Sequence, residues 1–137
     1  MDEQRNVSTL AALIIEIRKL NVAKGWRVHF PDDAPAPRTG PWFAAYCALA
    51  TTEVSEALDA YRDKTWSSVK DPCINYVADN AACMHDHKPI GVGPELADAL
   101  IRILDMADIW DVDIEYELAR VLTYGWTRPY QHGGRVL

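Results

Sequence analysis

Apolar residues recur at helical spacing near the start of the chain. Across residues 8–24 the apolar positions follow the spacing i, i+3, i+4, i+7 and fall on one face of a helix: Leu10, Leu13, Ile14, Ile17 and Leu20. Asn6 or Ser8 can cap the start of this helix, and Gly25 can end it, because glycine readily adopts the left-handed conformation that follows a helix. The pattern therefore predicts an amphipathic helix over residues 8–24.

A second helix is predicted to begin at Pro41 or Trp42 and to end at Arg62. Proline suits the first turn of a helix, where the N–H that it lacks would have no intrahelical partner. Between residues 43 and 60 the only charged residues are three acids: Glu53, Glu56 and Asp59. Because a helix that is apolar on most sides is usually enclosed by the rest of the protein, we expect this helix to be largely buried.

Two further helices are predicted in the C-terminal half. The third runs from Pro94 or Glu95 to Trp110, and the fourth follows a turn at residues 111–113 and covers residues 114–124. No segment between turn signals shows the alternation that is typical of a strand. The predicted fold class is therefore all-α, a small antiparallel bundle of about four main helices.

Three connecting segments are typical of loops. Residues 27–41 form a proline-rich loop, residues 63–94 form a loop-rich insertion, and residues 125–137 form a basic tail. Within the insertion, residues 73–84 could form a short helix. Because 137 residues are enough for one core, we expect a single domain over residues 1–137.

The composition excludes several classes of protein. Hydrophobic residues make up 49% and charged residues 25%, which is ordinary for a globular domain. The net charge of −6 disfavours stable nucleic-acid binding, because that affinity depends on neutralising phosphates. No run of 18 apolar residues is present, the first seven residues do not resemble a signal peptide, and the three cysteines suit reduced thiols. We therefore expect a cytoplasmic protein with no membrane partner.

Two acidic pairs carry the candidate chemistry. Glu53 with Glu56, and Glu95 with Asp98, are each three residues apart, so each pair shares one face of a helix. Two facing helices could bring all four carboxylates to one point, where their charges repel and are costly to desolvate. A hard divalent cation such as Mg²⁺ resolves this repulsion, since it prefers oxygen ligands and can bridge phosphates.

An acidic stripe facing solvent is the alternative interpretation. On the third helix, Arg102 and Asp105 continue the arc of Glu95 and Asp98, as an ordinary polar face would. On the second helix the acids lie instead among apolar and small residues, which favours a functional role there.

Four motifs follow one another along the chain. They are residues 21–26 (NVAKGW), 52–62 (TEVSEALDAYR), 95–98 (ELAD) and 128–135 (RPYQHGGR). In this order they resemble the MazG-like nucleotide pyrophosphohydrolases, and most of all the short single-domain members common in bacteriophages. The resemblance implies an all-α enzyme that hydrolyses nucleoside triphosphates between the α and β phosphates, releasing a monophosphate and pyrophosphate. Its expected location is the cytoplasm, which is the host cytoplasm if a phage encodes the protein.

The resemblance also implies a metal site and an assembly. Glu53, Glu56, Glu95 and Asp98 would hold Mg²⁺, with Mn²⁺ as the alternative ion. Glu53 and Glu56 would also be the catalytic residues, with Glu53 the first candidate to orient the attacking water or accept its proton. The family implies a homo-oligomer, either a dimer or a tetramer.

Five residues are candidates for binding the nucleotide. Asn21 and Lys24 are three residues apart and could share a face toward the ligand, and Trp26 follows them at a helix end, where it could stack on the base. Arg128 and Arg135 are basic residues in an acidic chain and could contact the triphosphate.

The sequence departs from the family pattern at three places. Thr52 stands where the family often has a second acid, and the insertion between the acidic pairs is long. Val121 and Gly125 stand where the family often has a lysine and an asparagine, although Arg120 could supply the missing cation. A nucleotide-binding or regulatory protein with weak turnover is therefore the alternative function.

A zinc site in the insertion is a further alternative. Its ligands would be Cys73, Cys83, His85 and His87. Their spacing matches no common zinc module, which usually begins with two closely spaced cysteines. The competing interpretation is an ordinary polar loop.

Overall fold

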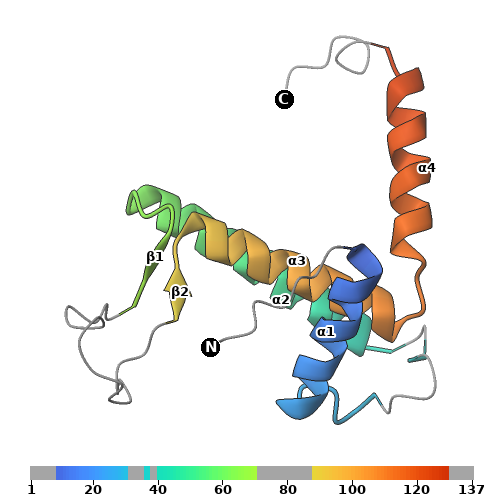
Figure 1. Cartoon of the computed structure of the whole chain (residues 1–137), viewed down its shortest axis with the longest axis horizontal. Coiled ribbons are helices and arrows are strands. Elements are labelled where there is room, and N and C mark those ends of the chain that lie inside the picture. The colour runs from blue at the N-terminus through green and yellow to red at the C-terminus, as the bar shows by residue number, and fades with distance from the viewer. Residues whose placement is uncertain (1–8, 31–35, 38–39, 71–87, 130–137) are drawn as a thin grey trace. The chain divides into compact units, whose positions relative to one another are not determined.

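The computed structural model describes residues 9–30, 36–37, 40–70 and 88–129. In chain order these residues form α1 (Leu10–Ala23), α2 (Trp42–Arg62), β1 (Ser68–Val69), β2 (Pro89–Ile90), α3 (Val92–Ile109) and α4 (Ile114–Thr127) (Figure 1). The prediction of a small all-α protein is confirmed, with one short two-stranded sheet added to it. The predicted short helix at residues 73–84 lies outside the described residues.

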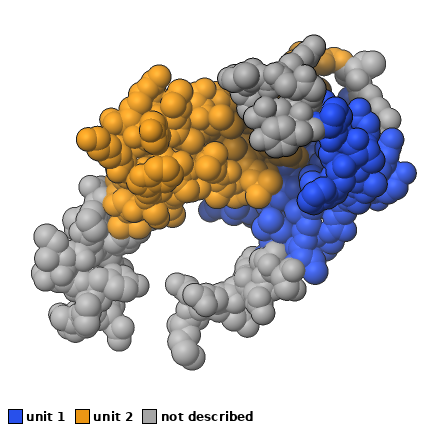
Figure 2. Space-filling model, turned by 90° about the horizontal axis from the view of Figure 1, so that it is seen from above, with its two compact units in different colours: residues 1–38, 104–137 blue, residues 39–103 orange. Residues whose placement is uncertain are grey.

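The chain divides into two compact units (Figure 2). Unit 1 comprises residues 1–38 and 104–137, and unit 2 comprises residues 39–103. Unit 1 contains α1, the end of α3 and α4, whereas unit 2 contains α2, the sheet and the first two thirds of α3. Each unit is defined by the contacts among its own residues.

α1 is closed at both ends by local hydrogen bonds. Its N-cap is Thr9, whose Oγ1 accepts a hydrogen bond from the backbone N–H of Ala12 at 3.1 Å. The predicted caps Asn6 and Ser8 were therefore wrong, by three residues and by one. At the other end Gly25 has φ +77°, as predicted for the residue that ends the helix. The N–H of Gly25 donates to the carbonyl of Val22 and the N–H of Trp26 to that of Asn21, which are the two bonds of a Schellman motif.

α2 is much less buried than its composition predicts. Its more enclosed positions form one narrow stripe: Tyr46, Ala50, Glu53, Ala57 and Ala60. Only Tyr46 and Ala57 are fully buried, while Phe43, Val54 and Leu58 are about half exposed. The prediction of a largely buried helix was therefore wrong for this chain, because much of the apolar count came from alanine and from side chains outside this stripe.

The two-stranded sheet makes α2 and α3 antiparallel. β1 and β2 pair antiparallel, with Ser68 opposite Ile90. Beside them, the N–H of Val92 donates to the carbonyl of Thr65 at 3.0 Å, which ties the start of α3 to the end of α2. Gly91 has φ +119°, and a Cβ there would lie 2.9 Å from the backbone of Trp66, so only glycine fits. Strands of two residues are too short for a pattern of alternation to predict.

The last two helices extend beyond their predicted limits. α3 begins at Val92, two residues early, with Pro94 in its first turn, where proline removes no intrahelical bond. α4 continues to Thr127, so the predicted basic tail begins inside a helix. Gly125 is therefore an interior helical residue, with open space where a side chain would stand.

A buried ionic cluster joins distant parts of unit 1. The side chain of Arg27 is only 6% exposed and forms ion pairs with Asp105 and with Asp108, the latter at 2.6 Å. Arg18 of α1 also pairs with Asp108, with its Nε 2.8 Å from Oδ2. Burial by itself would raise the pKa of Asp108, but hydrogen bonds from Arg18 and Arg27, together with their charges, lower it below its ordinary value. Asp108 is therefore ionised and matched by two guanidinium groups.

An aromatic contact lies in the same unit. The rings of Phe30 and Trp110 meet edge to face with their centroids 5.5 Å apart, and Trp110 Nε1 donates to the carbonyl of Pro37 at 3.1 Å. The N–H of Ala36 donates to the carbonyl of Ile109 at 2.9 Å. The segment after α1 is therefore held against the C-terminal end of α3.

Replacing Arg27 with methionine should destabilise the protein strongly. The variant leaves Asp105 without the buried guanidinium it faces and weakens the neutralisation of Asp108, a defect that typically costs about 3–5 kcal/mol. Urea denaturation followed by circular dichroism measures the loss. Arg120→Met is the matched control, because Arg120 forms an exposed pair with Glu117 that is worth less than about 1 kcal/mol. Equal losses in the two variants would contradict a structural role for the Arg27 cluster.

Candidate metal centre

Three carboxylates converge in unit 2. Glu53 comes from the enclosed stripe of α2, and Glu95 and Asp98 come from the first turns of α3, three residues apart. One carboxylate oxygen from each lies within 4.8 Å of the other two. The antiparallel pairing of α2 with α3 is what brings these acids together across 42 positions of sequence.

Glu95 is the most buried of the three acids. The residue is 8% exposed, and its Oε2 is buried with no hydrogen-bond partner among the described residues. Burial raises the pKa of Glu95, the charge of Lys88 lowers it, and the charges of Glu56, Asp98 and Glu53 raise it further. Burying a hydrogen-bond acceptor without a donor costs free energy. A cation or a proton bound to this oxygen would remove that cost.

The donor set fits a hard divalent cation. Mg²⁺ binds oxygen ligands at 2.0–2.1 Å in octahedral geometry, so two of its ligands lie about 3 Å apart when adjacent and about 4.2 Å apart when opposite. The three carboxylates offer oxygens within 4.8 Å of one another, which is close to these separations. The partnerless Oε2 of Glu95 provides one acceptor that such a cation would satisfy.

Glu53 is already paired with a cation from the protein. The Nε of Arg102 donates to its Oε1 at 3.1 Å, and the side chains of Arg102 and Glu53 are 24% and 13% exposed. The alternative interpretation placed Arg102 and Asp105 on a solvent-facing arc with Glu95 and Asp98. That alternative was wrong, because Glu95 and Asp105 are buried and Arg102 donates to Glu53.

The fourth predicted ligand stands at the edge of the site. Glu56 is exposed and lies outside the group of three converging acids, although its charge contributes to the raised pKa of Glu95. The sequence motif treated Glu53 and Glu56 as equivalent. Only Glu53 lies on the enclosed stripe of α2 that faces α3, so the structure distinguishes Glu53 from Glu56 as a metal ligand.

All five of the predicted nucleotide-binding residues belong to unit 1. Asn21 is buried, whereas Lys24 and Trp26 are exposed, so the first two do not present a common exposed face. Arg128 is exposed, with its guanidinium 5.6 Å from the centre of the Tyr124 ring. Arg135 lies outside the described residues. The role of each in binding a nucleotide stays a prediction.

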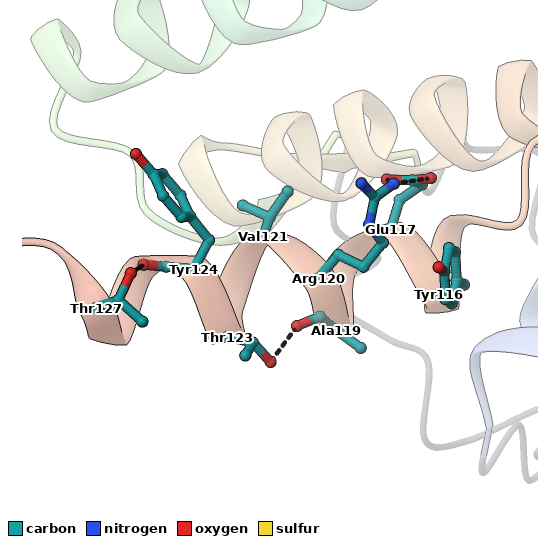
Figure 3. Close-up of a pocket in the computed structure, with 8 residues that line it drawn as sticks. All are labelled: Tyr116, Glu117, Ala119, Arg120, Val121, Thr123, Tyr124 and Thr127. Carbon is teal, nitrogen blue, oxygen red and sulfur yellow. Dashed lines mark hydrogen bonds and ion pairs between the residues drawn. The ribbon is translucent and has the colours of Figure 1, made fainter.

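A pocket of about 640 Å³ runs along α4 and is lined from residue 116 to residue 127 (Figure 3). Arg120 projects there, donating to both carboxylate oxygens of Glu117 at 3.0 and 3.1 Å and lying over the ring of Tyr116. Val121 also lines this pocket. The carboxylate of Glu117 thus balances the charge of Arg120. That Arg120 takes the place of the missing lysine stays a prediction.

The candidate zinc ligands Cys73, Cys83, His85 and His87 lie outside the described residues. Among the described residues Cys47 is an exposed free thiol. No helix in the described part of the chain is long and apolar enough to cross a membrane.

Comparisons of the chain with protein-family models, with curated proteins and with solved structures found no match. The resemblance to the MazG-like enzymes therefore rests on the four sequence motifs.

Replacing Glu95 with glutamine should abolish the response of the protein to Mg²⁺. The wild-type melting temperature should rise with Mg²⁺, since a ligand at 100 times its Kd adds about 2.7 kcal/mol to the free energy of unfolding. Without metal, the variant should be as stable as the wild type at pH 7 or more stable, because the raised pKa of Glu95 means that its ionisation disfavours folding as the pH rises above 4.5.

Thermal melts with and without millimolar Mg²⁺ measure both effects. Asp59→Asn is the control, because Asp59 is an exposed acid of α2 that pairs with Arg62. A variant at Glu95 that keeps the wild-type response to Mg²⁺ would contradict the site.

Proposed function

We propose that the protein is a Mg²⁺-dependent nucleoside triphosphate pyrophosphohydrolase that converts a ribo- or deoxyribonucleoside triphosphate to the monophosphate and pyrophosphate. The observation that carries the proposal is the buried, partnerless Oε2 of Glu95, in a carboxylate that converges with those of Glu53 and Asp98. This arrangement supports a divalent cation site. The substrate class comes from the resemblance of the motifs to the MazG-like enzymes.

The acids of the site have different roles in this proposal. Glu53, Glu95 and Asp98 hold the cation, which when bound polarises phosphoryl oxygens and makes a water more acidic. Glu56 is exposed and outside the converging group, so we assign to it the proton that the attacking water loses. The water oxygen bonds to the α phosphorus, the bond from that phosphorus to the α–β bridging oxygen breaks, and pyrophosphate leaves with the bond electrons.

A nucleotide-binding or regulatory protein with weak turnover is the second candidate function. Val121 is an exposed apolar residue and Gly125 has no side chain, so neither supplies the polar group expected at its position. Tight binding of a Mg²⁺–triphosphate complex without product formation would favour this alternative.

Hydrolysis of a panel of nucleoside triphosphates with Mg²⁺ should release monophosphate and pyrophosphate in equal amounts. Asp98→Asn should lower kcat by roughly 100-fold or more, the scale expected when a group that stabilises transition-state charge is lost. Chromatography of the nucleotides with separate assays for pyrophosphate and orthophosphate measures this, and Asp59→Asn should keep wild-type activity. Release of orthophosphate with a diphosphate left behind would contradict the proposal.

The proposal includes a homo-oligomer, supported by the apolar surface of unit 2. Each of its two long helices leaves a stripe of large apolar side chains about half exposed: Phe43, Val54, Leu58 and Tyr61 on α2, and Leu96, Leu100 and Ile103 on α3. Rows of half-exposed large apolar side chains along a helix are typical of a surface that binds another protein.

Light scattering at micromolar concentration should therefore give the mass of a dimer or a tetramer. Leu58→Lys combined with Leu100→Lys should shift the mass toward the monomer, because both substitutions place charge on the apolar stripes. A monomeric wild-type protein would contradict this part of the proposal.

A further inference from the structure

The acidic site of unit 2 contains a positive charge of its own. Arg102 follows Asp98 by four residues on α3, so its side chain lies one helical turn beyond that ligand on the same face. Its Nε donates to Glu53 Oε1 at 3.1 Å, and both side chains are largely enclosed. One of the three converging carboxylates is therefore neutralised by the protein itself.

We propose that Arg102 is an exchangeable counter-ion of the site. It neutralises Glu53 while the site lacks a metal, yields Glu53 to a divalent cation, and then binds a phosphate of the nucleotide. This inference rests on the proposed function, because it assigns the cation and the triphosphate to the same acidic site.

Competition at Glu53 supports the first half of the exchange. The guanidinium and a divalent cation both require the carboxylate of Glu53, and two positive charges held a few ångströms apart in a partly buried site repel each other. The charges of Glu95 and Asp98 offset part of this repulsion, but neither carboxylate replaces the Glu53 oxygen that Arg102 occupies. The cation therefore gains Glu53 at the expense of the bond from Arg102.

The chemistry of arginine supports the second half. A displaced guanidinium retains its charge at neutral pH and presents planar N–H groups that match two oxygens of one phosphate. Arg102 is 24% exposed, so it is not sealed away from a ligand at the site. A triphosphate held by the cation brings negative oxygens to the place from which the guanidinium was displaced.

Metal affinity without nucleotide tests the counter-ion role directly. Arg102→Gln should bind Mg²⁺ roughly three- to tenfold more tightly than the wild type, because one competing positive charge is removed. Arg102→Lys keeps the charge and should stay closer to the wild type. Arg62→Gln is the matched control, because Arg62 pairs with Asp59 on the exposed side of α2, and it should leave Mg²⁺ affinity unchanged. Isothermal titration calorimetry with Mg²⁺ alone measures all four proteins.

Nucleotide affinity tests the phosphate contact. With Mg²⁺ saturating, Arg102→Gln should bind a non-hydrolysable triphosphate analogue about tenfold more weakly, which is the expected cost of losing a charge-assisted contact. Arg102→Lys should recover part of this loss, since it restores the charge without the planar geometry.

The outcomes separate this inference from the proposed function. A wild-type protein that does not bind Mg²⁺ would overturn the proposed function. A wild type that binds Mg²⁺, together with an Arg102→Gln variant that binds it equally or less tightly, would overturn the counter-ion role alone. Tighter Mg²⁺ binding with unchanged affinity for the analogue would overturn the phosphate contact. If Arg102→Gln does not fold, Arg102→Lys decides, because analogue affinity equal to that of the wild type would contradict bidentate binding by arginine.

Discussion

The need to neutralise the acids enclosed along α3 is the constraint on which the rest of this structure depends. The helix carries two pairs of acids at the same spacing, Glu95 with Asp98 and Asp105 with Asp108. An enclosed carboxylate without a partner costs several kcal/mol, so each pair must be matched by positive charge. The two pairs are matched in different ways, and this difference distinguishes a structural cluster from a candidate site.

The second pair is neutralised permanently by side chains. Arg27 bonds to both Asp105 and Asp108, and Arg18 adds a second cation to Asp108. These arginines lie on α1 and just after it, so the pairing also fastens the N-terminal part of unit 1 to the end of α3. No fully buried side-chain acceptor of this cluster lacks a hydrogen-bond partner among the described residues, in contrast to Oε2 of Glu95.

The first pair is neutralised only in part. Arg102 reaches Glu53, the acid that α2 adds to the pair, while Oε2 of Glu95 has no hydrogen-bond partner among the described residues. A buried polar atom left in this way is uncommon in folded proteins and usually has a functional cause. The proposed metal site and the proposed exchange of Arg102 both follow from this incomplete neutralisation.

The sequence by itself determined the four helices of the described residues and which acids are candidates for the metal site. Helix periodicity, capping and motif spacing are properties of neighbouring residues, so the sequence can be used to predict them. Only the tertiary structure decided which acids act together. The stripe of α2 that meets α3 selects Glu53 over Glu56, and the pairing of Arg27 with Asp105 joins residues 78 positions apart. The alternative of a solvent-facing stripe that included Arg102 was wrong, and so was the expectation that α2 is largely buried. Burial depends on which faces of two helices meet, and the periodicity of one helix carries no information about its neighbour.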